Sequence, residues 1–68
     1  MRDINRLDKI YNKILTYHKE FPDIRFMQFM INFFTWYKFK YGNDGYYIED
    51  NIFILRFEEF MRDTFDRR

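Results

Sequence analysis

Residues 23–38 read DIRFMQFMINFFTWYK, and this stretch decides the class of fold that we expect. Ten of its sixteen side chains are large and apolar. On a helix at about 100° per residue they cover an arc of roughly 220°, whereas a surface helix needs a stripe of only ~100°. Pro22 suits the start of this helix, and Asp23 is its expected N-cap. The stretch therefore predicts a central second helix, with helices on two sides or a second subunit against it.

A further helix is expected on each side of this stretch. Residues 3–19 place apolar side chains at i, i+3 and i+4 spacings over an arc of roughly 160°, which predicts an amphipathic helix that Asp3 caps. Residues 50–66 separate an apolar face from a charged one in the same way. We therefore expect a third helix there, with Asp50 as its N-cap.

The segment between the second and third helices carries strong turn residues. Gly42 is the expected residue just past the end of the second helix, and residues 43–45 read Asn-Asp-Gly, which favours a turn. An ordered loop is one interpretation, and a short hairpin of residues 39–41 with residues 46–48 is the alternative. With either, we expect an all-α fold: a single domain over residues 1–68, with three helices around one aromatic core.

The composition excludes several ways of stabilising so small a chain. A domain of 68 residues is marginal alone, because it buries only about 60% of the surface that its unfolded chain exposes. Cys is absent and His18 is the only histidine, so we expect no disulfide, no metal site and no cofactor. Aromatic residues make up 25% of the chain, more than so small a core can hide. We therefore expect an exposed apolar patch and a homodimer.

The charged residues nearly balance, with twelve Lys+Arg against eleven Asp+Glu, which argues against a general nucleic-acid binder. Residues 1–42 carry eight basic and four acidic side chains, a net of +4, whereas residues 43–68 carry four and seven, a net of −3. This asymmetry fits pairing between helices or the orientation of a partner. No run of ~18 apolar residues is present, and the charged start does not resemble a signal peptide, so we expect no membrane association and a cytoplasmic location.

The sequence offers no catalytic residue. It contains no Ser, no Cys and no glycine-rich phosphate loop. Glu49 and Asp50 are adjacent carboxylates before a helix, and such residues are far more often caps than acid–base catalysts. His18 lies on the apolar face of the first helix near its end, where we expect a half-buried packing residue. The chain is therefore not expected to be an enzyme.

The aromatic surplus on the second helix and the loop after it predicts a surface that contacts a protein partner. The candidate residues are Phe29, Phe33, Trp36, Tyr37, Phe39 and Tyr41. Two apolar residues of the third helix, Ile52 and Leu55, fall off its main face and would extend that surface. The first hypothesis is accordingly a small non-enzymatic interaction module, which binds and modulates another protein through exposed aromatic side chains.

Residues 36–41 suggest a second hypothesis. They interleave aromatic rings with Lys38 and Lys40, and such runs can stack bases and contact phosphates. Two lysines are a weak electrostatic footprint, because phosphate binding recruits several cations. The alternative function is thus a small nucleic-acid-binding protein that uses the first helix and this run. The other interpretation is a purely structural role, in which the aromatic rings pack in the core and the lysines lie at the helix end.

A narrow polar wedge interrupts the apolar surface of the second helix. Arg25, Gln28 and Asn32 recur at i, i+3 and i+7, so they line one side of it. This side is either solvated or covered by the segment before the third helix. In the second case Arg25 would pair with Glu49 or Asp50 in a fork-like hydrogen bond that fixes the loop.

Three short motifs suggest a relationship. They read R-D-x-x-R at residues 2–6, P-D-x-R-x-x-Q at residues 22–28 and Y-I-E-D at residues 47–50. With them the chain resembles a family of very short uncharacterised bacterial and phage proteins, over nearly its whole length. The resemblance implies a protein of phage or mobile-element type, groups the polar wedge with the 47–50 segment, and implies no assigned activity.

Overall fold

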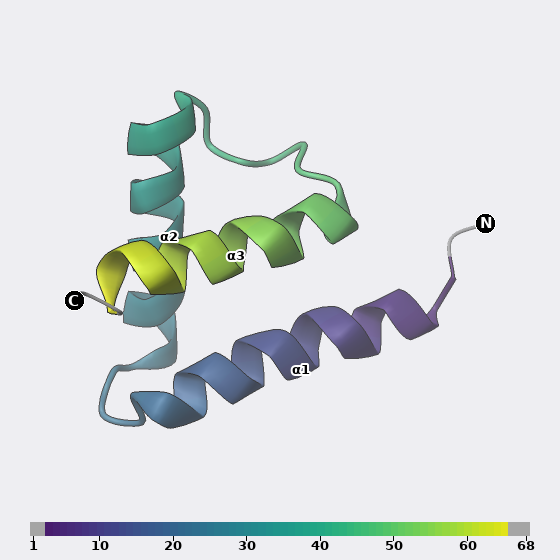
Figure 1. The fold of residues 1–68 in the computed structure, drawn as a ribbon, viewed down its shortest axis with the longest axis horizontal. Helices are drawn as coiled ribbons and strands as arrows, with labels where there is room; N and C mark the ends of the chain where they lie inside the picture. The colour runs from purple at the N-terminus through teal and green to yellow at the C-terminus, as the bar shows by residue number, and fades with distance from the viewer. Residues whose placement is uncertain (1–2, 66–68) are drawn as a thin grey trace.

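The computed structural model describes residues 3–65 and confirms the expected all-α fold of three helices (Figure 1). No strand is present among the described residues, so the hairpin alternative is wrong: residues 39–41 complete the second helix and residues 42–49 form a loop. The helices are α1 (Asn5–Glu20), α2 (Phe26–Tyr41) and α3 (Asp50–Thr64).

The helix ends explain where the predicted boundaries moved. Ile4 is the N-cap residue of α1 and Glu49 that of α3, so the predictions of Asp3 and Asp50 as N-caps are each wrong by one residue. The Asp3 carboxylate still accepts a hydrogen bond from the backbone N–H of Asn5 at 3.0 Å. Asp23 does not cap α2, which begins three residues later; the Gln28 side-chain oxygen instead accepts the backbone N–H of Arg25 at 3.3 Å. A short turn after Pro22 therefore delays the second helix. The predicted end of the third helix at residue 66 lies outside the described residues.

The loop is held by its own side chains and by two glycines. Gly42 ends α2 with φ of 80°, and its N–H donates to the carbonyl of Lys38, which confirms the predicted helix stop. Gly45 also has a positive φ, 81°, and its N–H donates to the Asn43 side chain at 3.0 Å. Left-handed backbone at these two positions thus turns the chain back toward the start of α3.

α3, not α2, occupies the centre of the fold. α1 and α3 lie side by side and run in the same direction, while α2 starts beside the C-terminal end of α1 and crosses behind the C-terminal half of α3 (Figure 1). Two ion pairs lie along the α1–α3 contact, Arg6 with Asp50 and Lys13 with Glu58. The second pair lies about two turns further along both helices, as expected for two helices that run in the same direction. α3 packs against both other helices, and the expectation of a central second helix is wrong.

The core forms where α2 crosses α3. Its six buried residues come from these two helices alone: Phe29, Phe33, Tyr37, Phe57, Phe60 and Met61. The Phe33 ring is fully buried and lies 4.9 Å from the stacked ring of Phe57 and 5.3 Å from the edge-on ring of Phe53. α1 contributes no buried residue, and covers this core with half-buried side chains such as Ile14 and Tyr17. The outer faces of α1 and α2 are therefore left unpaired.

Candidate protein-interaction surface

The predicted contact residues separate into three groups in the structure. Phe29, Phe33 and Tyr37 are buried, so their prediction as partner-contacting residues is wrong. They line the face of α2 that packs on α3, and the arc of apolar residues did not reveal which part of it the third helix would cover. Trp36 and Tyr41 are half-buried, and Phe39 is 93% exposed.

A polar cluster fastens the end of α2 to α3. The Trp36 indole N–H donates to Asp63 at 3.2 Å, the Lys40 ammonium lies 2.9 Å from the same carboxylate, and the Tyr41 hydroxyl donates to Glu59. The Tyr41 hydrogen bond lowers the pKa of Glu59, and the Lys40 hydrogen bond lowers the pKa of Asp63. The same bond to Glu59 raises the pKa of the Tyr41 phenol.

This cluster bears on the nucleic-acid hypothesis. Lys40 lies within 4 Å of both Glu59 and Asp63, so its charge is offset by two carboxylates of the same chain. Trp36 and Tyr41 are half-buried against α3 and Tyr37 is buried, so Lys38, Phe39 and Lys40 are the residues of the run that remain exposed. Lys38 is thus the one lysine of the run whose charge no carboxylate of the described residues offsets, and one such cation beside one exposed ring is a small footprint for a phosphate backbone.

The predicted polar network does not assemble. Among the described residues no ion pair joins Arg25 to Glu49 or Asp50, and Asp50 pairs instead with Arg6 of α1. The reason is distance along the helix. Arg25 lies at the start of α2, whereas the loop departs from its far end, about 24 Å away for sixteen residues at 1.5 Å each. Gln28 serves the helix start, and the wedge, Asn32 included, is the solvated side.

His18 is the half-buried packing residue that its position predicted. Its ring stacks on Phe29 at 4.8 Å between centroids. One ring nitrogen, Nε2, lies 2.5 Å from the backbone oxygen of Ile24. The histidine thus joins the end of α1 to the start of α2. No group of three or more potential metal ligands occurs among residues 3–65.

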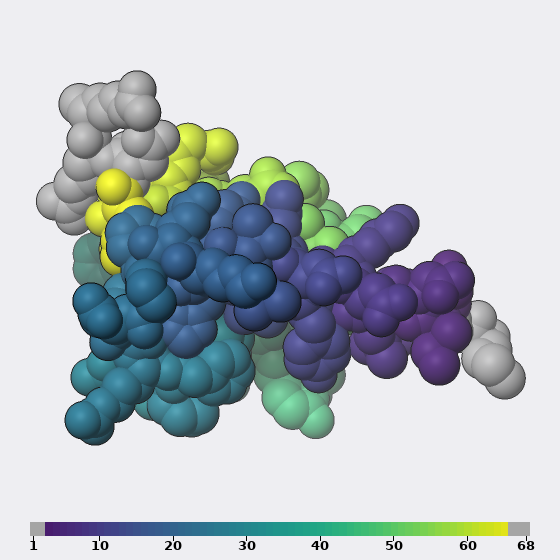
Figure 2. Space-filling view, turned by 90° about the horizontal axis from the view of Figure 1, so that it is seen from below, coloured from purple at the N-terminus to yellow at the C-terminus, as the bar shows by residue number. Residues whose placement is uncertain are grey.

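The largest apolar surface left open on α1 is a row that we call the α1 stripe. Its members recur at three- and four-residue spacings and are all exposed: Ile4, Leu7, Tyr11 and Leu15. Figure 2 shows α1, purple to blue, crossing the front of the molecule with no other element over it. The apolar face predicted for this helix is therefore wider than the part that α3 covers.

A second open row lies on α2, and we call it the α2 stripe. Met27, Ile31 and Phe34 are exposed at i, i+4 and i+7, and Lys38 follows one turn later on the same side. These three apolar residues belong to the arc of roughly 220° that indicated a surplus. An apolar surplus is therefore exposed on α2, but three of the six residues to which the sequence assigned it, Phe29, Phe33 and Tyr37, became the core, and none of the six belongs to the α2 stripe.

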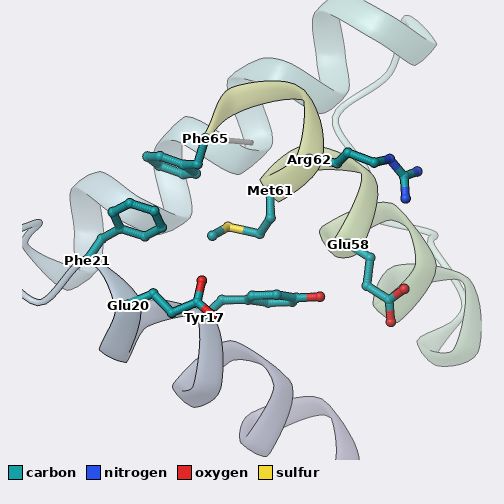
Figure 3. A pocket seen from close by; sticks show the side chains of 7 residues that line it. All are labelled: Tyr17, Glu20, Phe21, Glu58, Met61, Arg62 and Phe65. Carbon is teal, nitrogen blue, oxygen red and sulfur yellow. The ribbon is translucent and has the colours of Figure 1, made fainter. Parts of the chain in front are cut away.

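Two hollows among residues 3–65 are further candidate sites. The larger, about 460 Å³, lies between the C-terminal ends of α1 and α3 (Figure 3). The rings of Phe21 and Phe65 stack at one end of it, 4.2 Å apart, while Glu58 and Arg62 point away from them at the other. Its charged groups do not converge on one point, so we assign it no ligand. The smaller, about 190 Å³, is almost wholly apolar and lies beside the α1 stripe.

Comparison with family models, with curated proteins and with solved structures finds no match to this chain. The resemblance carried by the three motifs therefore stays a prediction, and the first of them includes Arg2, which lies outside the described residues. Within residues 3–65, no helix has the length and apolar character needed to cross a membrane. The exposed stripes are the feature from which a function can be argued.

Proposed function

We propose that this chain is a small non-enzymatic protein-interaction module, which binds another protein of its cell or of a phage through the α2 stripe. The observation that carries the proposal is the exposure of Met27, Ile31 and Phe34 on one side of a helix whose opposite core face is already filled. Exposed apolar rows of this kind mark interaction sites on small domains.

The geometry of the stripe indicates the chemistry of its partner. A helix that presents apolar anchors at i, i+4 and i+7 fits the apolar face of a partner helix or a shallow apolar groove. Lys38 continues the row by one turn and is exposed, so a carboxylate on the partner beside its apolar residues would complement it. We therefore propose a partner with an acidic amphipathic helix, met in the cytoplasm.

The test compares two variants that differ only in the side of α2 that they alter. Ile31→Glu places a charge in the stripe, whereas Asn32→Glu places the same charge one residue away on the polar wedge. Proteins captured from a host lysate by the wild type are identified by mass spectrometry, and the binding of each purified candidate is then titrated. We expect one partner to bind the wild type and Asn32→Glu equally and Ile31→Glu at least tenfold more weakly. Equal binding to all three would overturn the proposal.

A further inference from the structure

We infer that the α1 stripe is the contact surface for the α1 of a second copy of this chain, with the two helices antiparallel. This inference deepens the proposed function, on which it rests, because it assigns one of the two open apolar stripes to self-association. It leaves the α2 stripe free for a different protein.

The stripe is complementary to itself in one antiparallel register. When Tyr11 lies level with Leu15 of the second copy, the two-fold axis places Leu15 level with the Tyr11 of that copy. In the same register Leu7 lies level with residue 19 of the second copy, and Ile4 lies level with its Pro22. Tyr11 and Leu15 of the two stripes thus meet each other, whereas Leu7 meets Lys19 in the last turn of the other α1 and Ile4 meets the turn after it.

The smaller hollow lies where this register needs a socket. It is lined by Leu15, His18, Lys19 and Pro22, and nearly all of its surface is apolar. These residues are the ones that the register places opposite positions 4–11 of the second copy. A side chain the size of Leu7 fits a hollow of about 190 Å³, so each copy offers both an apolar projection and a socket for it.

Charges beside the stripe agree with the same register. At about 100° per residue, Asp8 and Lys19 lie on one flank of the stripe, some 20° apart around the helix. Neither takes part in an ion pair within the described residues. Antiparallel packing sets Asp8 of each copy within one residue of the level of Lys19 of the other. The dimer therefore gains two symmetric opposite-charge contacts at its edges.

The exposed area matches what a small dimer needs. If a fully exposed large side chain offers roughly 200 Å², the exposed fractions of the four stripe residues amount to about 450 Å² per copy, or about 900 Å² per pair. Apolar atoms supply about 60% of an interface, so this corresponds to roughly 1,500 Å² in total, within the range of specific complexes.

The experiment is sedimentation velocity of the whole chain from micromolar to near-millimolar concentration. We expect the wild type to dimerise, Leu15→Glu to raise the dissociation constant at least tenfold, and Ile31→Glu on the α2 stripe to leave it unchanged. Asp8→Lys and Lys19→Asp should each weaken the dimer, and the double variant should restore it. Far-UV circular dichroism of each variant establishes that it is folded.

Two outcomes would overturn the inference. One is a wild type that stays monomeric at the highest concentration, and the other is a double charge variant no tighter than either single one. Its failure is distinguishable from failure of the proposed function, because the two use different helices. A monomer that still captures its partner in an Ile31-dependent way leaves the proposed function standing, whereas an Asp8–Lys19-dependent dimer that captures nothing leaves only the inference.

Discussion

Replacing Phe33 by Ala is the sharpest test of the core. The Phe33 ring is fully buried, and it lies within 6.1 Å, centroid to centroid, of six other rings. Removing a buried Phe side chain costs about 3–5 kcal/mol through lost transfer energy and the cavity left behind. Because aromatic pairs add about 0.5–1.5 kcal/mol each beyond burial, we expect the upper half of that range.

That loss is comparable to the whole stability of the chain. At roughly 0.05–0.15 kcal/mol per residue, 68 residues give about 3–10 kcal/mol of unfolding free energy. At ~4–8 °C per kcal/mol, a loss of about 4 kcal/mol or more should lower the Tm of Phe33→Ala by at least about 16 °C. If the wild type lies in the less stable part of the range above, the substitution should unfold the domain.

The assay is urea unfolding followed by circular dichroism, at one fixed protein concentration so that self-association contributes equally. Phe39→Ala is the matched control: the same substitution on the same helix, at a side chain that is 93% exposed. We expect it to change the unfolding free energy by less than about 0.5 kcal/mol. If Phe33→Ala lost less than about 1 kcal/mol, or if the two variants were equally destabilised, the close packing of α2 on α3 around this ring would be refuted.

Two further predictions concern the polar cluster and the loop. The pKa values of Glu59 and Asp63 are lowered in the folded chain, so around these values the folded state binds fewer protons than the unfolded one. The contribution of the two carboxylates to the free energy of unfolding is therefore complete above about pH 5, where the unfolded carboxyl groups are ionised. It is lost as the pH falls through the folded pKa values. Urea unfolding at pH 7 and pH 3 should show this loss, and Glu59→Gln should reduce it; a variant with an unchanged pH dependence would contradict the assignment. Gly42→Ala should cost about 1 kcal/mol because φ is 80°, and Gly45→Ala should cost more, because its Cβ would lie 2.9 Å from Ile48 Cδ1. Thermal unfolding of the two variants checks this order, and an equal or reversed order would count against it.

The sequence predicted the helices well because local rules govern them. Apolar spacing located all three, and Gly42 ended the second helix where its freedom at positive φ was needed. The prediction of Asp23 as the N-cap was wrong because a residue that favours capping shows where a helix can begin, not where it does begin. The turn after Pro22 then takes up three more residues before Phe26. Capping preferences do not predict the length of such a turn.

The candidate site was harder to predict because it depends on which face each helix presents to its neighbours. The arc of apolar residues on α2 showed that its core face and an exposed face must coexist. The arc could not show which residues belong to which face, because Phe33 and Phe34 are equally apolar. Only the position of α3 distinguishes the buried ring of Phe33 from the exposed ring of Phe34. The Arg25 network failed for the same reason, since pairing it with residues 49–50 assumed that both ends of α2 lie near the loop.

The division of the apolar surface follows from the way α3 is placed. The fifteen residues of α3 pack against both other helices. Large buried rings fill its contact with α2, whereas half-buried side chains and ion pairs form its contact with α1. α1 therefore keeps an apolar flank that neither other helix of the described chain covers, and α2 keeps one on the side away from α3. The described residues hold no fourth helix over these flanks, and a second chain is the cover that we propose for them. The same shortage that limits its stability thus supplies the surfaces from which we propose its function.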